Sequence, residues 1–229
     1  MVLRLRQAVL AARDLDAAVE RLRSALPLGE AFADPGVGHF GLRNAVMALG
    51  DTFVEVVSPV QEDTAAGRHL ERRGDGGYMV MFQLDDLDGA RARAAALGIR
   101  TVWELELPDI VDVHLHPRDV GAAIVALDHC DPPEGWRWGG PEWEGRAPAS
   151  VAAGGVTGAT IRATDPDALT ARWAEVLGVP LADTRKIALD LGELRFVEGP
   201  DDGIEAFHAE VPSRRGERVE AAGVRFELE

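Results

Sequence analysis

The sequence has 229 residues, of which 46% are hydrophobic and 28% are charged, and its formal net charge at pH 7 is −15. A chain of this size can bury the core of one large domain or two small ones. Nucleic acids and anionic membranes bind basic surfaces, so this charge argues against both as partners. No apolar run approaches the roughly 20 residues of a membrane span. The single cysteine, Cys130, excludes an intrachain disulfide, so we expect a cytoplasmic protein.

A strand followed by a helix opens the chain. Apolar and β-branched residues over 4–12 predict the strand, and apolar residues at helical spacing over 14–26 predict the helix. Asp14 is placed to accept hydrogen bonds from the first free N–H groups of that helix. Two further strands, predicted at residues 44–49 and 52–57, complete this first module.

The same strand, cap and helix pattern returns three times, beginning near residues 82, 161 and 207. Internal repetition of this kind is strong evidence about a fold, although such units also recur by chance in α/β proteins. The second module is predicted to contain, in order, a strand, a helix and three strands at residues 77–84, 87–97, 101–107, 110–116 and 121–128. The third has predicted strands near 155–163, 186–191 and 194–198. The fourth is incomplete, with one strand, one helix and a last strand at 224–228.

The predicted fold class is therefore α+β, built from repeated βαβββ modules of which the last is truncated. The predicted domains are a first domain at 1–130 with modules at 1–60 and 77–130, a connector at 131–150, and a second, incomplete domain at 151–229. The connector is rich in Pro, Gly and Trp, and we expect its tryptophans to pack across a surface. Lining a ligand cleft is the alternative role for them.

Two strands carry polar residues that need an explanation. Alternation places Glu55 on one strand face with Phe53 and Val57, where a carboxylate requires a cation, a donor or water. An edge-strand glutamate that faces solvent is the alternative. His114 and His116 are two residues apart on one predicted strand, so both imidazoles point to the same face. That spacing lets both reach one metal ion or one anionic substrate.

The paired modules, with LRQAVLAARDLDAA opening one and HPRDVGAAIVALD closing the next, resemble the vicinal oxygen chelate superfamily. This superfamily includes glyoxalase I, the bleomycin-resistance proteins, extradiol dioxygenases and methylmalonyl-CoA epimerase, and the second stretch is most similar to the epimerases. The resemblance covers residues 1–129 closely and 151–229 more loosely. It implies glyoxalase-like half-barrels around a divalent metal, which polarises substrate oxygens so that an enolate can form.

The resemblance also implies where metal ligands fall. Gln7 and Glu55 occupy the ligand positions of the first module, and each carries a suitable oxygen. Met79 and Ala126 occupy those of the second, and neither holds a hard divalent ion. Three explanations stay open: a rebuilt site for zinc, nickel, iron, cobalt or manganese, a metal-free pocket, or modules that pair differently. The rebuilt site would consist of Gln7, Glu55, His114 and His116.

Three functions follow from these alternatives. As an enzyme, the protein would be a metal-dependent isomerase or lyase acting on a small oxo acid or acyl thioester through an enolate. Glu55 would then be the catalytic base only if it is not a ligand. As a metal-free binding protein, it would sequester a small molecule without turnover. As a pseudo-enzyme, it would use its module faces in a homodimer or with a partner. The candidate ligand contacts are His39, Arg43, Asn44 and Trp103.

Overall fold

The computed structural model describes residues 2–143, 154–181 and 183–229. The end of the predicted connector and the predicted start of the second domain at Val151 lie outside these ranges. In the described part of the chain, no helix is long and apolar enough to span a membrane.

The first module is a strand, a helix and two strands: β1 (Leu3–Ala11), α1 (Leu15–Ala25), β2 (Leu42–Leu49) and β3 (Thr52–Pro59). The predicted cap is confirmed, because the Asp14 side chain accepts a hydrogen bond from the Ala17 N–H at 3.0 Å. Where a complete βαβββ unit has a further strand, this module has an isolated bridge between Phe32 and Val46. Helix α2 (Ala65–Arg73) leads to the second module.

The second module is complete and follows the predicted order. It consists of β4 (Gly76–Leu84), α3 (Leu87–Ala96), β5 (Thr101–Leu107), β6 (Ile110–Leu115) and β7 (Ile124–Cys130), with the short helix α4 (Pro117–Val120) before the last strand. The third module contains β8 (Gly155–Ala163), α6 (Pro166–Leu177), β9 (Lys186–Ala188) and β10 (Glu193–Glu198).

The fourth module contains strands where a helix was predicted. It consists of β11 (Gly203–Glu210), a single 3-10 turn, β12 (Arg218–Ala221) and β13 (Val224–Leu228). The predicted helix is wrong because β12 and β13 form an antiparallel hairpin in which Val219 faces Phe226. The turn between them needs two successive residues at positive φ, and Ala222 (49°) and Gly223 (79°) provide them.

All four modules share one pairing rule. The first strand of each pairs in parallel with the last, so β1 pairs with β3, β4 with β7, β8 with β10 and β11 with β13. The described strands form a seven-stranded sheet in the order β2-β3-β1-β4-β7-β6-β5 and a six-stranded sheet in the order β12-β13-β11-β8-β10-β9. The predicted α+β class with repeated modules is confirmed.

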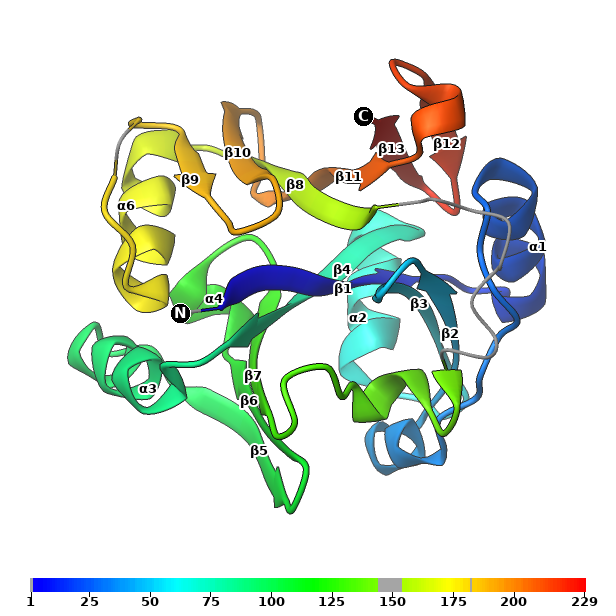
Figure 1. Cartoon of the computed structure of the whole chain (residues 1–229), viewed down its shortest axis with the longest axis horizontal. Coiled ribbons are helices and arrows are strands. Elements are labelled where there is room, and N and C mark those ends of the chain that lie inside the picture. The colour runs from blue at the N-terminus through cyan, green and yellow to red at the C-terminus, as the bar shows by residue number, and fades with distance from the viewer. Residues whose placement is uncertain (1, 144–153, 182) are drawn as a thin grey trace. The chain divides into compact units, whose positions relative to one another are not determined.

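The chain divides into two units. The first comprises residues 1–5, 79–136 and 157–205, and the second comprises residues 6–78, 137–156 and 206–229. Within the first unit, α3 lies beside α6, and within the second, α1 lies beside β12 (Figure 1). The domain division predicted from the repeat stays a prediction.

Each unit contains an aromatic contact that involves a tryptophan. In the first, the buried Trp173 on α6 packs edge-on against Phe82 and Phe196, and its Nε1 donates to the Val120 carbonyl at 3.0 Å. In the second, Phe53 packs edge-on against Trp143 with ring centroids 5.1 Å apart. Trp136 is buried as well, so these two connector tryptophans pack as expected.

Candidate functional site

A buried carboxylate lies on the first module, held by two side-chain amides. Gln7 Nε2 donates to Glu55 Oε2 at 2.8 Å, and Asn44 Nδ2 donates to Glu55 Oε1 at 2.6 Å. Glu55 is only 6% exposed, which rules out the solvent-facing alternative. Because each carboxylate oxygen accepts a hydrogen bond from an amide, much of the cost of burying the charge is offset.

The strand register explains why these three residues meet. Val9 of β1 and Val46 of β2 both lie opposite Glu55 of β3, on either side of it. Gln7 and Asn44 are each two positions from those partners, so alternation puts them on the same sheet face as Glu55. The Asn44 side chain is fixed further, because its Oδ1 accepts a hydrogen bond from the Asp34 N–H at 2.9 Å.

The donor set at this face does not fit a hard divalent ion. The two amides present N–H groups to Glu55, whereas a metal ligand would present its oxygen. The positions that fall on Met79 and Ala126 offer no oxygen or nitrogen. Among the described residues, no group of three or more His, Cys, Asp or Glu side chains is arranged to hold a metal ion.

An open groove of about 860 Å³ lies between α1 and β2 in the second unit. Two of the predicted ligand contacts, Arg43 and Asn44, line it together. Arg43 also makes a 3.7 Å ion pair with Asp16 of α1. Asn44 therefore contributes both to the groove and to the buried carboxylate, while His39 stacks edge-on against Phe40 on an exposed 3-10 helix.

The second module carries a different polar cluster. His114 Nε2 lies 3.0 Å from Asp112 Oδ2, and Trp103 of β5 lies opposite His114 in the strand ladder. Asp112 is buried and lies opposite the equally buried Asp128 of β7. The sequence reasoning missed both aspartates, although each interrupts an apolar strand, IVDVHL and IVALDHC.

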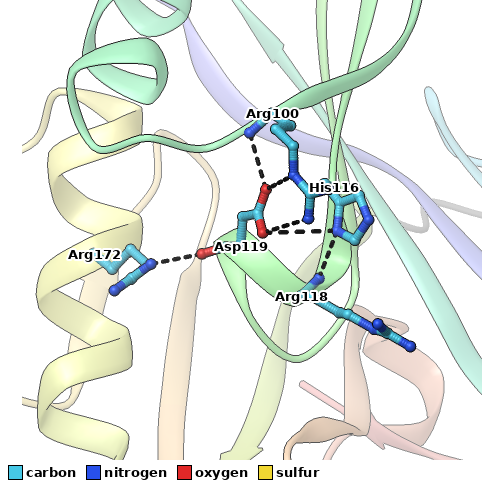
Figure 2. A network of polar contacts seen from close by, with 5 residues as sticks. All are labelled: Arg100, His116, Arg118, Asp119 and Arg172. Atoms are coloured by element: carbon cyan, nitrogen blue, oxygen red, sulfur yellow. Dashed lines mark hydrogen bonds and ion pairs between the residues drawn. The ribbon is translucent and has the colours of Figure 1, made fainter.

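His116 makes its contacts apart from this cluster. Strand β6 ends at Leu115, and His116 caps α4, because its Nδ1 accepts a hydrogen bond from the Arg118 N–H at 3.1 Å. Its Nδ1 also lies 4.0 Å from Asp119 (Figure 2). The strand alternation that would align His116 with His114 stops before it. A metal site built on both histidines stays a prediction.

Asp119 is held mainly by an arginine. Arg100 Nε and Nη2 donate to its two carboxylate oxygens at 2.6 and 2.9 Å, as Figure 2 shows. These bonds hold the pKa of Asp119 well below its usual range. Arg172 Nη1 donates to the Asp119 carbonyl at 2.6 Å, so the network fastens α4 to α6. Asp119 therefore has a structural role in the segment that precedes the closing strand β7.

Comparison with known proteins gives a consistent match. A family model described as a glyoxalase-like domain matches residues 8–177. Methylmalonyl-CoA epimerase from Streptomyces coelicolor, solved with 2-nitronate-propionyl-CoA, is 24% identical with a TM-score of 0.50, over 57% of this chain and 99% of its own. An epimerase complex with methylmalonyl-CoA has the same identity and TM-score, over 57% and 96% of the two chains.

A fourth comparison covers the whole chain. A hypothetical protein from Staphylococcus aureus has a TM-score of 0.73 at 8% identity, over 100% of this chain and 99% of its own. No curated protein matches the sequence. At sequence identities of 8–24%, the similarity to these solved structures establishes the fold alone.

Proposed function

The chain belongs to the glyoxalase-like domain family, and from this premise we propose that it binds a small organic molecule on its first module, at the groove between α1 and β2. Arg43 and Asn44 would contact the ligand, and Glu55 would fix the orientation of Asn44. The proposal needs no metal ion, in keeping with a donor set that does not fit one.

The observation that supports the proposal is that Asn44 lines the groove and is also held by two hydrogen bonds. It lines the groove, and its amide nitrogen donates to the buried Glu55 while its oxygen accepts from the Asp34 N–H. A side chain tied at both ends cannot rotate freely. Ligand sites typically combine apolar walls with a few such fixed polar groups, because a pre-oriented group loses little entropy on binding.

A ligand-observed NMR screen tests the proposal. The compounds would be methylmalonyl-CoA, propionyl-CoA, pyruvate, 2-oxobutyrate and a set of aliphatic acids, amines and amino acids. Ala33 lines the groove and is exposed, so Ala33→Trp should fill the groove and abolish binding. Ala96→Trp, at an exposed site on α3, is the matched control and should bind as the wild type does. Binding that survives Ala33→Trp would place the ligand elsewhere.

A second candidate function, isomerisation of an acyl thioester, is favoured by Glu55 itself. Glu55 is a buried carboxylate on the first module, and a carboxylate can act as the general base that removes a proton from a carbon next to a carbonyl. The epimerases with this fold were solved with CoA thioesters. That likeness makes methylmalonyl-CoA the first substrate to try.

Solvent exchange tests this second function. In D₂O, the wild type should exchange the α-proton of methylmalonyl-CoA for deuterium, as followed by ¹H NMR. Glu55→Gln should slow the exchange by about 100-fold or more, the usual contribution of a general base. If the wild type exchanges no faster than buffer, the isomerase function is wrong and the binding function stands on its own test.

A further inference from the structure

The groove between α1 and β2 carries a balanced set of charges. Its lining includes two acidic and two basic side chains, Asp16, Glu20, Arg23 and Arg43. Arg43 and Asp16 already pair with each other at 3.7 Å. The Glu20 carboxylate and the Arg23 guanidinium, in contrast, make no ion pair or hydrogen bond with any other side chain among residues 2–143, 154–181 and 183–229.

Helix geometry keeps these two charges close together. Glu20 and Arg23 are three residues apart on α1, so their Cβ atoms are separated by about 5–6 Å on one helix face. Both line the groove, and both are exposed. A ligand that lies in the groove therefore meets a negative and a positive side chain within the length of a small molecule.

The rest of the lining is largely apolar. Leu15 and Val19 of α1 form one wall, and Ala31, Ala33 and Ala45 contribute to the other. These small side chains leave room for a branched aliphatic group and bury part of its surface, which favours binding. The groove thus offers hydrocarbon contact next to one acid and one base.

From this arrangement we propose that the groove takes a zwitterion with an aliphatic tail, of the amino acid class. Its carboxylate would pair with Arg23, its ammonium group with Glu20, and its tail would lie against Leu15 and Val19. A ligand with one charge gains one of these ion pairs and is repelled by the other side chain, whereas a zwitterion gains both. The inference rests on the proposed binding function and names its ligand class.

Three probes of matched shape test the inference on the full chain. Leucine carries both charges, 4-methylpentanoate lacks the ammonium group, and 3-methylbutylamine lacks the carboxylate. Leucine should bind at least about 5-fold more tightly than either analogue in ligand-observed NMR titrations, as expected when a second exposed ion pair is added. Equal affinity for all three probes would overturn the proposal.

Charge-neutral variants assign each contact. The Glu20→Gln variant should bind leucine no more tightly than 4-methylpentanoate. The Arg23→Gln variant should bind leucine no more tightly than 3-methylbutylamine. Arg21→Gln and Glu30→Gln are matched controls, because both residues are exposed and neither lines the groove, and both should keep the wild-type preference. A preference that persists in both groove variants would also overturn the proposal.

Failure of this inference can be told apart from failure of the proposed function. If another screened compound binds and is lost in Ala33→Trp while leucine does not bind, the groove is a ligand site and the zwitterion class is wrong. If no screened compound binds the wild type, both proposals are wrong.

Discussion

Glu55 is a buried carboxylate in an apolar sheet, and such a group requires hydrogen-bond donors around it. The sequence identified it as a carboxylate in need of a partner, and the structure provides amide donors from the two neighbouring strands. Alternation within β3 was enough to assign its face. Its partners could not be assigned with equal ease, because the register of β1 and β2 against β3 depends on contacts that are distant in the sequence.

Replacing Glu55 with Gln should destabilise the protein by about 1.5–3 kcal/mol, the typical value of a charge-assisted hydrogen bond. The new NH₂ group faces the N–H of either Gln7 or Asn44, so one buried donor loses its acceptor. Urea unfolding at pH 7 measures the change. Glu30→Gln, at an exposed position, is the control and should alter stability by less than about 0.5 kcal/mol. An equally small effect of Glu55→Gln would contradict the prediction.

His69 should make the protein sensitive to mild acid. Burial, assisted by Arg73 and Arg72, lowers the pKa of His69 from 6.5 to about 4. Since the unfolded chain binds the proton more readily, stability is full above pH 6.5 and falls as the pH drops towards 4. The loss should be on the order of 1 kcal/mol, because the ring is partly exposed and solvent screens its charge.

The variant His69→Phe isolates this effect, since it keeps a ring for the edge-on contact with Tyr78. The difference in the free energy of unfolding between the two proteins should be constant above pH 6.5. Below pH 6.5 the wild type should lose more stability than the variant does. Parallel pH profiles would show that His69 titrates normally.

The Cys130 thiol should be unreactive in the native protein. Burial, with the charge of Asp128 as a second cause, raises the pKa of Cys130 to about 12. The thiolate is the reactive form, so Ellman's reagent at pH 8 should label the native protein negligibly over an hour and the protein in guanidinium chloride within minutes. Rapid labelling under native conditions would show that β7 opens far more often than its burial implies.

At the scale of elements, three helices begin with the same device. Asp14, Asp86 and Asp165 each accept a hydrogen bond from the N–H group three residues later, at 3.0, 3.1 and 3.0 Å. Such caps depend on the local sequence alone, which is why the starts of α1 and α3 could be predicted. The fourth module has no helix with such a cap. Its hairpin depends on the pairing of β13 with β12 and β11, which local propensity does not predict.

Removing one of these caps should have a measurable cost. Asp165→Ala leaves the Ala168 N–H of α6 without its side-chain acceptor, so we expect a loss of about 1 kcal/mol. Denaturant unfolding checks the value. Glu175→Ala, at an exposed position of the same helix, should change stability by less than about 0.5 kcal/mol and controls for helix propensity. Similar effects of both substitutions would argue against the cap.

At the scale of the whole molecule, the repeat in the sequence predicted the α+β fold, and the resemblance of two motifs together with the repeat predicted the family, which the family match over residues 8–177 confirms. The candidate site was predicted less completely. Gln7, Asn44 and Glu55 form one hydrogen-bonded group in the structure. Asp112 and Asp128, which lie opposite each other, were not predicted, because the sequence of one strand does not determine its register against another. Cytoplasmic location and a homodimer stay predictions.

The net charge of −15 should make stability depend on salt. Like charges on a folded surface repel one another, and salt screens that repulsion, with a Debye length that shrinks from about 30 Å at 0.01 M to about 8 Å at 0.15 M. The melting temperature at pH 7 should therefore rise when NaCl is increased over this range. Calorimetry in both buffers measures it, and a fall would show that attractive ion pairs dominate.

The order of the segments has a consequence for how the protein is made. The second unit contains residues 6–78 and also residues 206–229, whereas the first is drawn mostly from the chain between them. Residues 206–229 leave the ribosome only after residues 79–205 have been synthesised. The strands of residues 6–78 therefore lack part of their unit until residues 206–229 have been synthesised, and during that interval chaperones can bind the nascent chain.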